Sequence, residues 1–330
     1  MKRSRILGTG RCLPERVVTN GDMAKLVPTS DEWIQQRTGV KERRFVTKET
    51  PADLGAAAAR AALDAAGLKP SDIDFLICAT QTPQHFFPGT GCFVQRLLDM
   101  PGIGALDVRD QCTGFLYGLS IADAYIRLGT YRRILLVCPE VHSPGLEWSE
   151  RGRHVTVLFG DGAGAIVVGE SESPDRGILS VHLHADGRYA NDLILEAPGM
   201  AYNPWISAEM LEEGMQFPKM NGKAVFKEAV TSMAAAVKEA LAANKLSIGD
   251  VTFFIPHQAN MRISEAVGQQ IGIAPDRVDH SIQRYGNCAA ASVPIALDER
   301  VRAGQFKPGD TLLFATFAAG FTWGSAILRW

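Results

Sequence analysis

The sequence lacks the features that mark membrane, nucleic-acid-binding and metal-binding proteins. No stretch of its 330 residues approaches the roughly 18 consecutive apolar residues of a membrane-spanning helix. The formal net charge is −2, so no overall positive field attracts nucleic acid or an anionic membrane. There is no CxxC pair and no histidine cluster with metal-ligand spacing, so we expect no bound metal.

Cysteines are few, and their spacing shows no pairing. In a chain of this size we expect free thiols in a reducing compartment, most of them small core residues. The first eight residues, MKRSRILG, are basic but lack the apolar stretch of a secretion signal, so we expect the mature start of a cytoplasmic protein. The six cysteines are Cys12, Cys78, Cys92, Cys112, Cys138 and Cys288.

Nucleotide-binding loops are also missing. The glycine-rich string FGDGAGA at residues 159–165 has neither the GK[ST] ending of a phosphate loop nor GxGxxG spacing before a helix. An apolar run typical of a strand follows it at residues 166–168. The string Gly8-Thr9-Gly10 fails the same test. Both strings therefore predict close packing of the backbone rather than a nucleotide site.

Apolar runs suited to strands alternate along the chain with helical patterns, among them a helix at residues 51–66 between Pro51 and Gly67. This alternation favours an α/β protein with largely parallel sheets. Residues 68–78 and 246–255 repeat one pattern, a polar turn that leads into an apolar strand after an Ala-rich helix. We therefore predict two similar halves, residues 1–175 and 176–330. Residues 197–220 break the rhythm of strands and helices and are interpreted as an irregular insertion that could form part of a substrate pocket.

Cys112 lies in the motif DQCTGF at residues 110–115, between an apolar run and a helical pattern. We expect the run at residues 103–108 to be a buried strand, which would place the cysteine on a sharp turn. A cysteine in the first turn of a long helix faces the positive end of the helix dipole, which favours the thiolate. Cys112 is therefore the candidate nucleophile.

His257 and Asn287 lie in two further motifs, IPHQAN at residues 255–260 and YGNCAA at residues 285–290. We expect each at a strand-to-helix junction. Together they supply two donors that can polarise a thioester carbonyl and stabilise the enolate left when a β-carboxylate departs as carbon dioxide. An amide cannot take up a proton, which suits carbanion stabilisation better than base catalysis. The three motifs together predict decarboxylative carbon–carbon bond formation from thioesters.

Several short strings stand in a fixed order along the chain. They are TSDEWI (29–34), RTG (37–39), DQCTGF (110–115), FGDGAGA (159–165), HADG (184–187), PHQAN (256–260), GN (286–287) and GFTWGSA (320–326). Through these strings the chain resembles the β-ketoacyl-acyl-carrier-protein synthase III family of initiating condensing enzymes. The resemblance covers essentially the whole length. It implies an α/β thiolase fold, in which two similar αβαβαββ-type halves form a five-layered αβαβα sandwich.

The resemblance implies a role for each motif residue. An acyl-CoA primer would acylate Cys112, and His257 and Asn287 would drive decarboxylation of malonyl-ACP, the malonyl-loaded acyl carrier protein. The backbone N–H groups of Cys112 and Ala319 would form the oxyanion hole. Coenzyme A thioesters would be substrates, no separate cofactor would be needed, and the enzyme would be a homodimer. The implied binding residues are Trp33, Arg37 and Arg151 for the CoA nucleotide, Asn260 for the pantetheine arm, Arg262 for the acidic carrier protein, and Phe87 for the acyl pocket across the dimer interface.

Three departures from the family pattern bear on specificity. Ala318 and Ala319 stand where the family has glycines, and Gln269 and Gln270 stand where basic residues often help to bind the carrier protein. The insertion around residues 201–220 and the string QTPQHF at residues 81–86 fall where acyl specificity is set. These two segments favour a medium-chain primer over a plain acetyl primer.

Alternative functions remain open. A thiolase would need a second cysteine in the C-terminal glycine loop, and a hydroxymethylglutaryl-type synthase would need a glutamate base beside the nucleophile, which residues 81–84 do not offer. A specialised condensing enzyme of secondary metabolism would join an acyl-CoA to a non-carrier partner. An acyl transferase would load Cys112 without releasing carbon dioxide. A non-catalytic dimer partner would not need the three motif residues.

Overall fold

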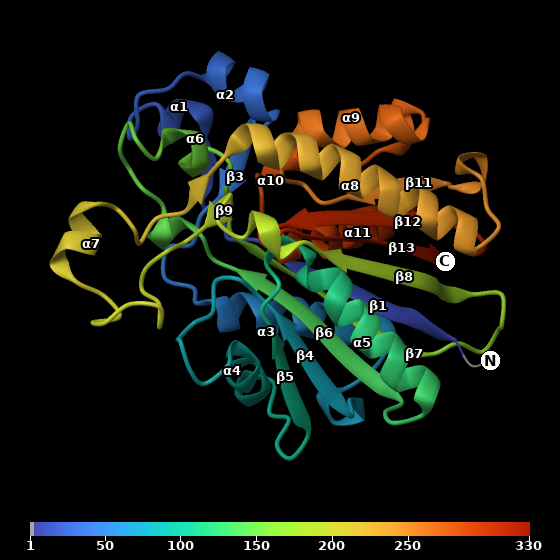
Figure 1. Cartoon of the computed structure of the whole chain (residues 1–330). Coiled ribbons are helices and arrows are strands. Elements are labelled where there is room, and N and C mark those ends of the chain that lie inside the picture. The colour runs from blue at the N-terminus through green and yellow to red at the C-terminus, as the bar shows by residue number, and fades with distance from the viewer. Residues whose placement is uncertain (1–2) are drawn as a thin grey trace.

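The protein is built on two mixed β-sheets with helices outside and between them (Figure 1). The computed structural model describes residues 3–330, so the first two residues of the expected mature start lie outside it. The first sheet has the order β1 (Ser4–Cys12), β7 (Gly162–Glu170), β6 (Arg133–Glu140), β4 (Phe75–Ala79), β5 (Gly104–Val108). The second has the order β11 (Phe253–Pro256), β12 (Thr311–Ala318), β13 (Thr322–Arg329), β8 (Gly177–Ala185).

The helices complete five layers. α3 (Pro51–Ala66) and α4 (Thr90–Leu97) share a buried cluster with the first sheet, and α8 (Gly222–Ala243) and α9 (Met261–Ile271) share one with the second. A third cluster joins both sheets through α5 (Gly114–Leu128) and α11 (Ser292–Arg302), which lie between them. Figure 1 shows α8 and α9 over the second sheet. The αβαβα sandwich predicted from the resemblance is therefore confirmed.

The prediction of largely parallel sheets is wrong. Among the ladders within the two large sheets, only β4–β5, β4–β6 and β11–β12 are parallel. The others are antiparallel: β1–β7, β6–β7, β12–β13 and β13–β8. A turn at residues 319–321 joins β12 to β13, and so short a connection permits only antiparallel pairing. Alternation of strands and helices in the sequence does not reveal such hairpins.

Helix α3 shows how local sequence fixes an element. Its N-cap Thr50 and Asp53 form a capping box, Pro51 fills the first turn, and Gly67 ends the helix in the left-handed conformation. The predicted bounds of this helix are confirmed. Gly8 and Gly10 of β1 lie directly against α3, because a Cβ at either position would overlap a helix carbonyl oxygen. The predicted close packing of this string is therefore confirmed.

Smaller elements surround one end of the sandwich. The insertion contains α7, which projects at the left of Figure 1, and the β9–β10 ribbon borders it. All five strands of the first sheet lie within residues 4–170, and all four strands of the second lie within residues 177–329. The division at residue 175 stays a prediction. The small elements are β2 (Val17–Thr19), α1 (Asn20–Met23), α2 (Asp31–Thr38), β3 (Glu42–Arg44), α6 (Arg153–Thr156), β9 (Leu193–Ile194), α7 (Ala208–Glu212), β10 (Lys219–Met220) and α10 (Ile282–Tyr285), together with short 3-10 turns.

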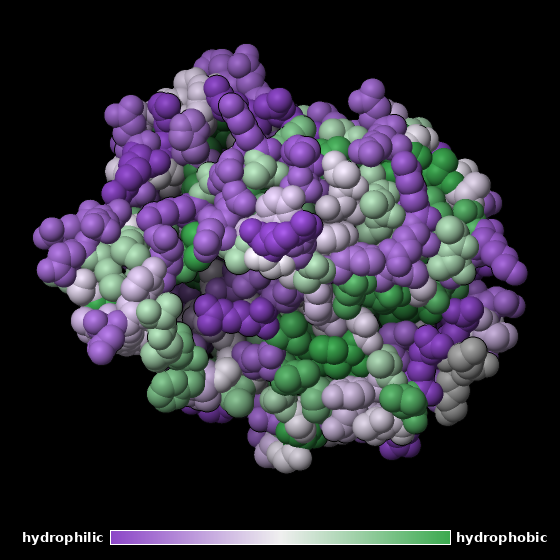
Figure 2. Space-filling view, in the orientation of Figure 1, coloured by the Kyte–Doolittle hydropathy of each residue, from purple (hydrophilic) through white to green (hydrophobic). Residues whose placement is uncertain are grey.

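The surface is mainly hydrophilic on the face that Figure 2 shows, with a green area below the centre where Figure 1 places α5. Within residues 3–330, no helix is long and apolar enough to cross a membrane. Over the same range, no group of three or more His, Cys, Asp or Glu side chains is arranged to hold a metal ion.

Candidate active site

Cys112 lies on a short 3-10 turn, Gln111–Thr113, that leads directly into α5. Gln111 has φ of 42°, a left-handed conformation that a side-chain-bearing residue adopts only under local constraint. Thr113 braces the turn, because its hydroxyl donates to the Asp110 carboxylate (2.6 Å). The sharp turn predicted for Cys112 is therefore present. The preceding strand β5 is a partly exposed edge strand, however, and not the buried strand that was predicted.

The Cys112 thiol is buried, with 8% of the residue exposed. Burial raises the pKa of Cys112 well above its ordinary value, and the carboxylates of Glu140 and Asp110 raise it further. Its own backbone N–H acts in the opposite direction. The helix terminus favours the thiolate, as the sequence analysis expected, but burial acts in the opposite direction and has the largest effect on the pKa of Cys112.

Asn287 is buried between α10 and the turn Ala289–Ala291. Its N–H donates to the Leu158 carbonyl (2.8 Å), and its own carbonyl accepts from the Gly160 N–H (3.0 Å). The FGDGAGA string therefore supports this residue through its backbone. The side-chain oxygen of Asn287 accepts from the Ala289 N–H (2.8 Å), which fixes the amide orientation. Asn287 follows a short helix, so the prediction of a strand-to-helix junction is wrong here.

His257 follows β11 and precedes α9, as its motif predicted. Its N–H donates to the Ala315 carbonyl of β12 (2.8 Å), which ties it to the second sheet. The residue is 2% exposed, and neither ring nitrogen has a hydrogen-bond partner among the described residues. Burial lowers the pKa of His257 to about 3, with a smaller contribution from His142. A neutral imidazole with both ring nitrogens free can hydrogen-bond an incoming ligand.

Contacts among their neighbours bring the motif residues together. Cys112 forms one small buried cluster with Ala289 and Ala318. Ala289 is the residue that holds the Asn287 amide. Ala318 ends β12, the strand to which His257 is bonded, and Ala319 follows it. The Cys112 sulfur therefore lies at the meeting point of the Asn287 turn and the end of β12.

Glu140 is a buried carboxylate near this junction that the motif analysis missed. It ends β6, is fully buried, and accepts from the hydroxyls of Thr80 (3.2 Å) and Thr82 (2.6 Å). Its other oxygen accepts from the backbone N–H groups of Gln81 (3.2 Å) and Ala290 (3.3 Å). An acidic residue that closes a strand of apolar residues was the only available signal in the sequence.

The Trp33 ring on α2 forms an aromatic platform that two arginines and a histidine surround. The guanidinium groups of Arg37 and Arg153 lie 5.0 Å and 5.1 Å from the centre of the Trp33 ring. The His154 ring lies 5.3 Å from it, centre to centre. Arg153 was not predicted. The Asn260 side chain donates to the Arg37 carbonyl (2.9 Å) and caps α9, so it lies next to this platform.

Arg151 contacts the insertion instead of Trp33. It donates to the Glu147 carboxylate (2.7 Å) and to the Glu213 carbonyl (3.0 Å). Its guanidinium lies against Gly214, where a Cβ would overlap it. The insertion is therefore attached to the loop before α6, and these contacts occupy Arg151.

The remaining predicted binding residues lie at the surface. Arg262 is exposed in the first turn of α9, with its guanidinium 5.8 Å from the Phe226 ring centre. Phe87 is 81% exposed, so within one chain it does not line a closed acyl pocket. Its neighbour Phe86 packs edge-on against Trp205 of the insertion (5.8 Å between ring centres). The insertion therefore contacts both the Phe86 loop and the Arg151 loop.

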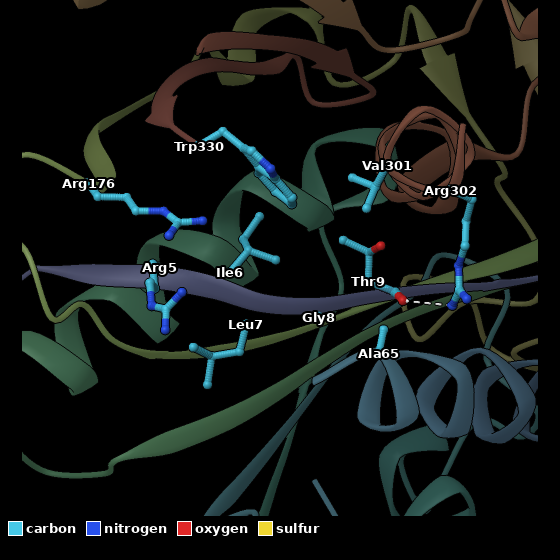
Figure 3. A pocket seen from close by; sticks show the side chains of 10 residues that line it. All are labelled: Arg5, Ile6, Leu7, Gly8, Thr9, Ala65, Arg176, Val301, Arg302 and Trp330. Atoms are coloured by element: carbon cyan, nitrogen blue, oxygen red, sulfur yellow. Dashed lines mark hydrogen bonds between the residues drawn. The ribbon is translucent and has the colours of Figure 1, made fainter. Parts of the chain in front are cut away.

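A cavity of about 300 Å³ lies along β1, and none of the three motif residues lines it. Figure 3 shows Arg5, Arg176 and Arg302 around it, with Arg302 bonded to the Thr9 carbonyl. Arg302 also pairs with Asp298, and Arg5 lies 3.9 Å from Glu172. These two carboxylates partly neutralise the positive charge of the arginines that line the cavity. The candidate active site is therefore the buried junction around Cys112.

Comparison with known proteins gives consistent matches. A family model described as 3-oxoacyl-[acyl-carrier-protein (ACP)] synthase III matches residues 106–187, and one described as the C-terminal part of that enzyme matches residues 241–330. A β-ketoacyl-[acyl-carrier-protein] synthase III of Thioalkalivibrio sulfidiphilus is 45% identical over the full length of both chains. The crystal structure of 3-oxoacyl-[acyl-carrier-protein] synthase III from Aquifex aeolicus has a TM-score of 0.91 at 40% identity, covering 99% of this chain and all of that one. The priming β-ketosynthase from the R1128 polyketide pathway has a TM-score of 0.89 at 34% identity, covering 99% of this chain and 96% of that one.

Proposed function

The chain belongs to the β-ketoacyl-[acyl-carrier-protein] synthase III family, and we propose that it condenses an acyl-CoA primer with malonyl-ACP to start fatty acid synthesis. It is an acyltransferase of the condensing type. The observation that carries the residue assignment is the buried junction in which Ala289 and Ala318 contact Cys112. Ala289 fixes the Asn287 amide, and β12 holds His257 beside the same junction.

The first step loads the nucleophile. The Cys112 sulfur attacks the acyl-CoA carbonyl, a carbon–sulfur bond forms, and the bond to CoA breaks. The Cys112 proton leaves with CoA as its free thiol, so charge balances. Backbone N–H groups of Cys112 and Ala319 hold the oxyanion of the tetrahedral intermediate. The N-terminus of α5 stabilises negative charge on sulfur as it develops.

The second step forms the carbon–carbon bond. The malonyl carboxylate leaves as carbon dioxide, and its bonding electrons form an enolate whose oxygen accepts hydrogen bonds from His257 and Asn287. The enolate carbon attacks the acyl group on Cys112. Collapse of this intermediate releases a β-ketoacyl product and returns Cys112 as a thiolate that takes up a proton. Both donors need only bind an anion, which suits an imidazole that stays neutral.

The experiment that tests this function is intact-protein mass spectrometry after brief incubation with acyl-CoAs from acetyl to dodecanoyl. We expect a mass gain on Cys112 that disappears during a malonyl-ACP chase, with release of a β-ketoacyl product. The primer that loads fastest identifies the chain length. Acylation that persists through the chase would contradict condensation, and absence of acylation would contradict the nucleophile assignment.

Arg153 is the proposed partner of Trp33 in holding the CoA nucleotide, a role that the resemblance gave to Arg151. We expect Arg153→Ala to raise the KM for acyl-CoA about three- to tenfold, because a cation facing an aromatic ring contributes about 0.5–1 kcal/mol in addition to its charge. The value of kcat for Arg153→Ala should equal that of the wild-type enzyme. The acyl-pantetheine thioester lacks the nucleotide, so its KM should not change.

Arg96 supplies the matched control for this prediction. Its guanidinium lies 5.2 Å from the Phe93 ring centre, away from the platform, so Arg96→Ala should leave both KM values unchanged. An equal rise in KM for acyl-CoA and acyl-pantetheine in Arg153→Ala would contradict nucleotide binding at this arginine.

Two features support a homodimer and a medium-chain primer. β5 is an edge strand, and the highly exposed Phe87 is available to a second copy of the chain. The contact between Phe86 and Trp205 joins the insertion to the loop beside Phe87, where acyl length would be sensed. We propose that the enzyme works in the cytoplasm with CoA thioesters as substrates and without a further cofactor.

A specialised condensing enzyme is the second candidate. The likeness to a polyketide priming enzyme favours it, and so does the neutral exposed pair Gln269 and Gln270 on α9. In such an enzyme, the group that condenses with the acyl primer would not be carried on the acyl carrier protein. Glu140 does not supply the glutamate base that a hydroxymethylglutaryl-type synthase would need, because four hydrogen-bond donors already occupy its carboxylate.

A further inference from the structure

Glu140 connects the end of β6 to the segment after β4 and to the turn Ala289–Ala291, which contacts Cys112. One oxygen binds Thr80 and Thr82, which follow β4, and the other binds the Ala290 N–H. The first residue of α5, Gly114, packs between Ala79 and Ala290, where an added Cβ would lie 3.2–3.4 Å from their methyl groups. Ala290 therefore lies between the buried carboxylate and the helix that carries the nucleophile.

The turn that Glu140 holds is strained. Ala289 has φ of 41°, a left-handed conformation that is costly for alanine, and its N–H fixes the Asn287 amide. Such a bend persists only where its surroundings determine it. The hydrogen bond from the next residue, Ala290, to Glu140 is one of the contacts that do so. Ala289 also packs against Cys112, so a relaxed bend would shift both the amide donor and the sulfur's neighbour.

We propose that Glu140 is a positioning residue of the condensing site: its carboxylate holds the Ala289 bend and places a negative charge close to Cys112. This inference rests on the proposed function, since it assigns Cys112 as the nucleophile. The negative charge of Glu140 also bears on the nucleophile. Burial has the largest effect on the pKa of Cys112, and the Glu140 carboxylate raises this pKa further. Burial also raises the pKa of Glu140, while His142 and its hydrogen-bond donors lower it.

Other ionisable groups lie around Glu140 and Cys112, and their charges also influence the pH dependence of Cys112 reactivity. Glu140 is the larger of the two carboxylate effects on Cys112, ahead of Asp110. The His142 ring lies 3.9 Å from Glu140, with one nitrogen against the Gly160 carbonyl and the other against the Gln81 amide. The groups that act on the pair or respond to it are Asp110, His142 and the thiols of Cys78, Cys138 and Cys288, and His142 also acts on His257.

The test is the pH dependence of Cys112 alkylation by iodoacetamide, followed by peptide mass mapping. Glu140→Gln keeps one oxygen toward the two N–H donors and turns an NH₂ toward the threonine hydroxyls, so only the charge is lost. We expect the alkylation profile to move about one pH unit lower, and alkylation at neutral pH to be about tenfold faster. The acylation profile should move in the same direction. An unchanged profile would overturn the proposal.

Asp107→Asn is the control, because Asp107 is another carboxylate that accepts a hydrogen bond from a backbone N–H, that of Gly91 (2.9 Å). It is not among the groups that act on Cys112, so its profile should match wild type. Thr82→Val serves if Glu140→Gln does not fold. The Glu140 carboxylate stays charged at the pH where Cys112 ionises, so the alkylation profile should match wild type, but the loosened carboxylate should release the Ala289 bend and slow condensation by acylated enzyme. A condensation rate equal to wild type would overturn the role of Glu140 in holding the bend.

The alkylation readout separates this inference from the proposed function. Iodoacetamide needs neither acyl-CoA nor malonyl-ACP, so a wild-type protein that fails to condense would contradict the function and leave this test intact. Conversely, normal condensation with an unmoved alkylation profile in Glu140→Gln would overturn only the role of Glu140.

Discussion

Replacing Cys112 with serine is expected to abolish acylation, to below about one-thousandth of the wild-type rate. The site already raises the pKa of the thiol through burial and two carboxylates, and a hydroxyl is far harder to ionise than a thiol. A serine nucleophile needs a strong neighbouring base. His257 cannot supply one, because burial lowers its pKa to about 3.

Intact-protein mass after incubation with acyl-CoA measures this loss. Cys288→Ser is the matched control, since Cys288 is also a buried thiol, next to Asn287, and burial raises its pKa as well. The control should acylate at the wild-type rate and the Cys112 variant should not. Acyl transfer to Cys112→Ser, or its loss in Cys288→Ser, would show that the nucleophile is misassigned.

Local sequence signals predicted parts of the fold well. The bounds of α3 follow from a capping box, a proline and a glycine that act within one helical turn of each end. Strand direction was not predicted, because it depends on partners far away in sequence. β1, for example, pairs with β7, more than a hundred residues later. The resemblance supplied the layered architecture that alternation alone left open.

In the candidate site, too, local motifs could be recognised in the sequence, but effects of residues distant in the sequence could not. Cys112, His257 and Asn287 were found because each lies in a compact motif, and neighbouring residues bring them to one buried junction. The raised pKa of Cys112 could not be predicted, because its causes are burial and carboxylates such as Glu140, which is distant in the sequence. Our proposal of Arg153 in place of Arg151 also rests on contacts that the sequence does not show. The two positions are two residues apart, and only the contacts with Glu213 and Trp33 distinguish them.

Replacing His257 or Asn287 with alanine is expected to leave acylation largely intact and to slow decarboxylation about a hundred- to a thousandfold. Each change removes a donor from a water-poor site, where the enolate finds no substitute. Asn287→Asp tests the donor role more specifically than Asn287→Ala. It keeps an oxygen for the Ala289 N–H, so the turn survives, but it replaces the amide donor with a charge that repels the enolate. We expect its loss to equal or exceed that of Asn287→Ala.

The measurement is carbon dioxide release from malonyl-ACP by enzyme already acylated on Cys112, so that loading does not limit the rate. Its pH profile tests the state of His257. The pKa of this imidazole falls from 6.5 to about 3 on burial, so the ring stays neutral throughout the working range and is charged only in strong acid. The wild-type decarboxylation rate should therefore show no step near pH 6.5. A step there that disappears in His257→Ala would mean that the donor is an imidazolium, and the enolate would then be held by a full charge rather than by two neutral hydrogen bonds.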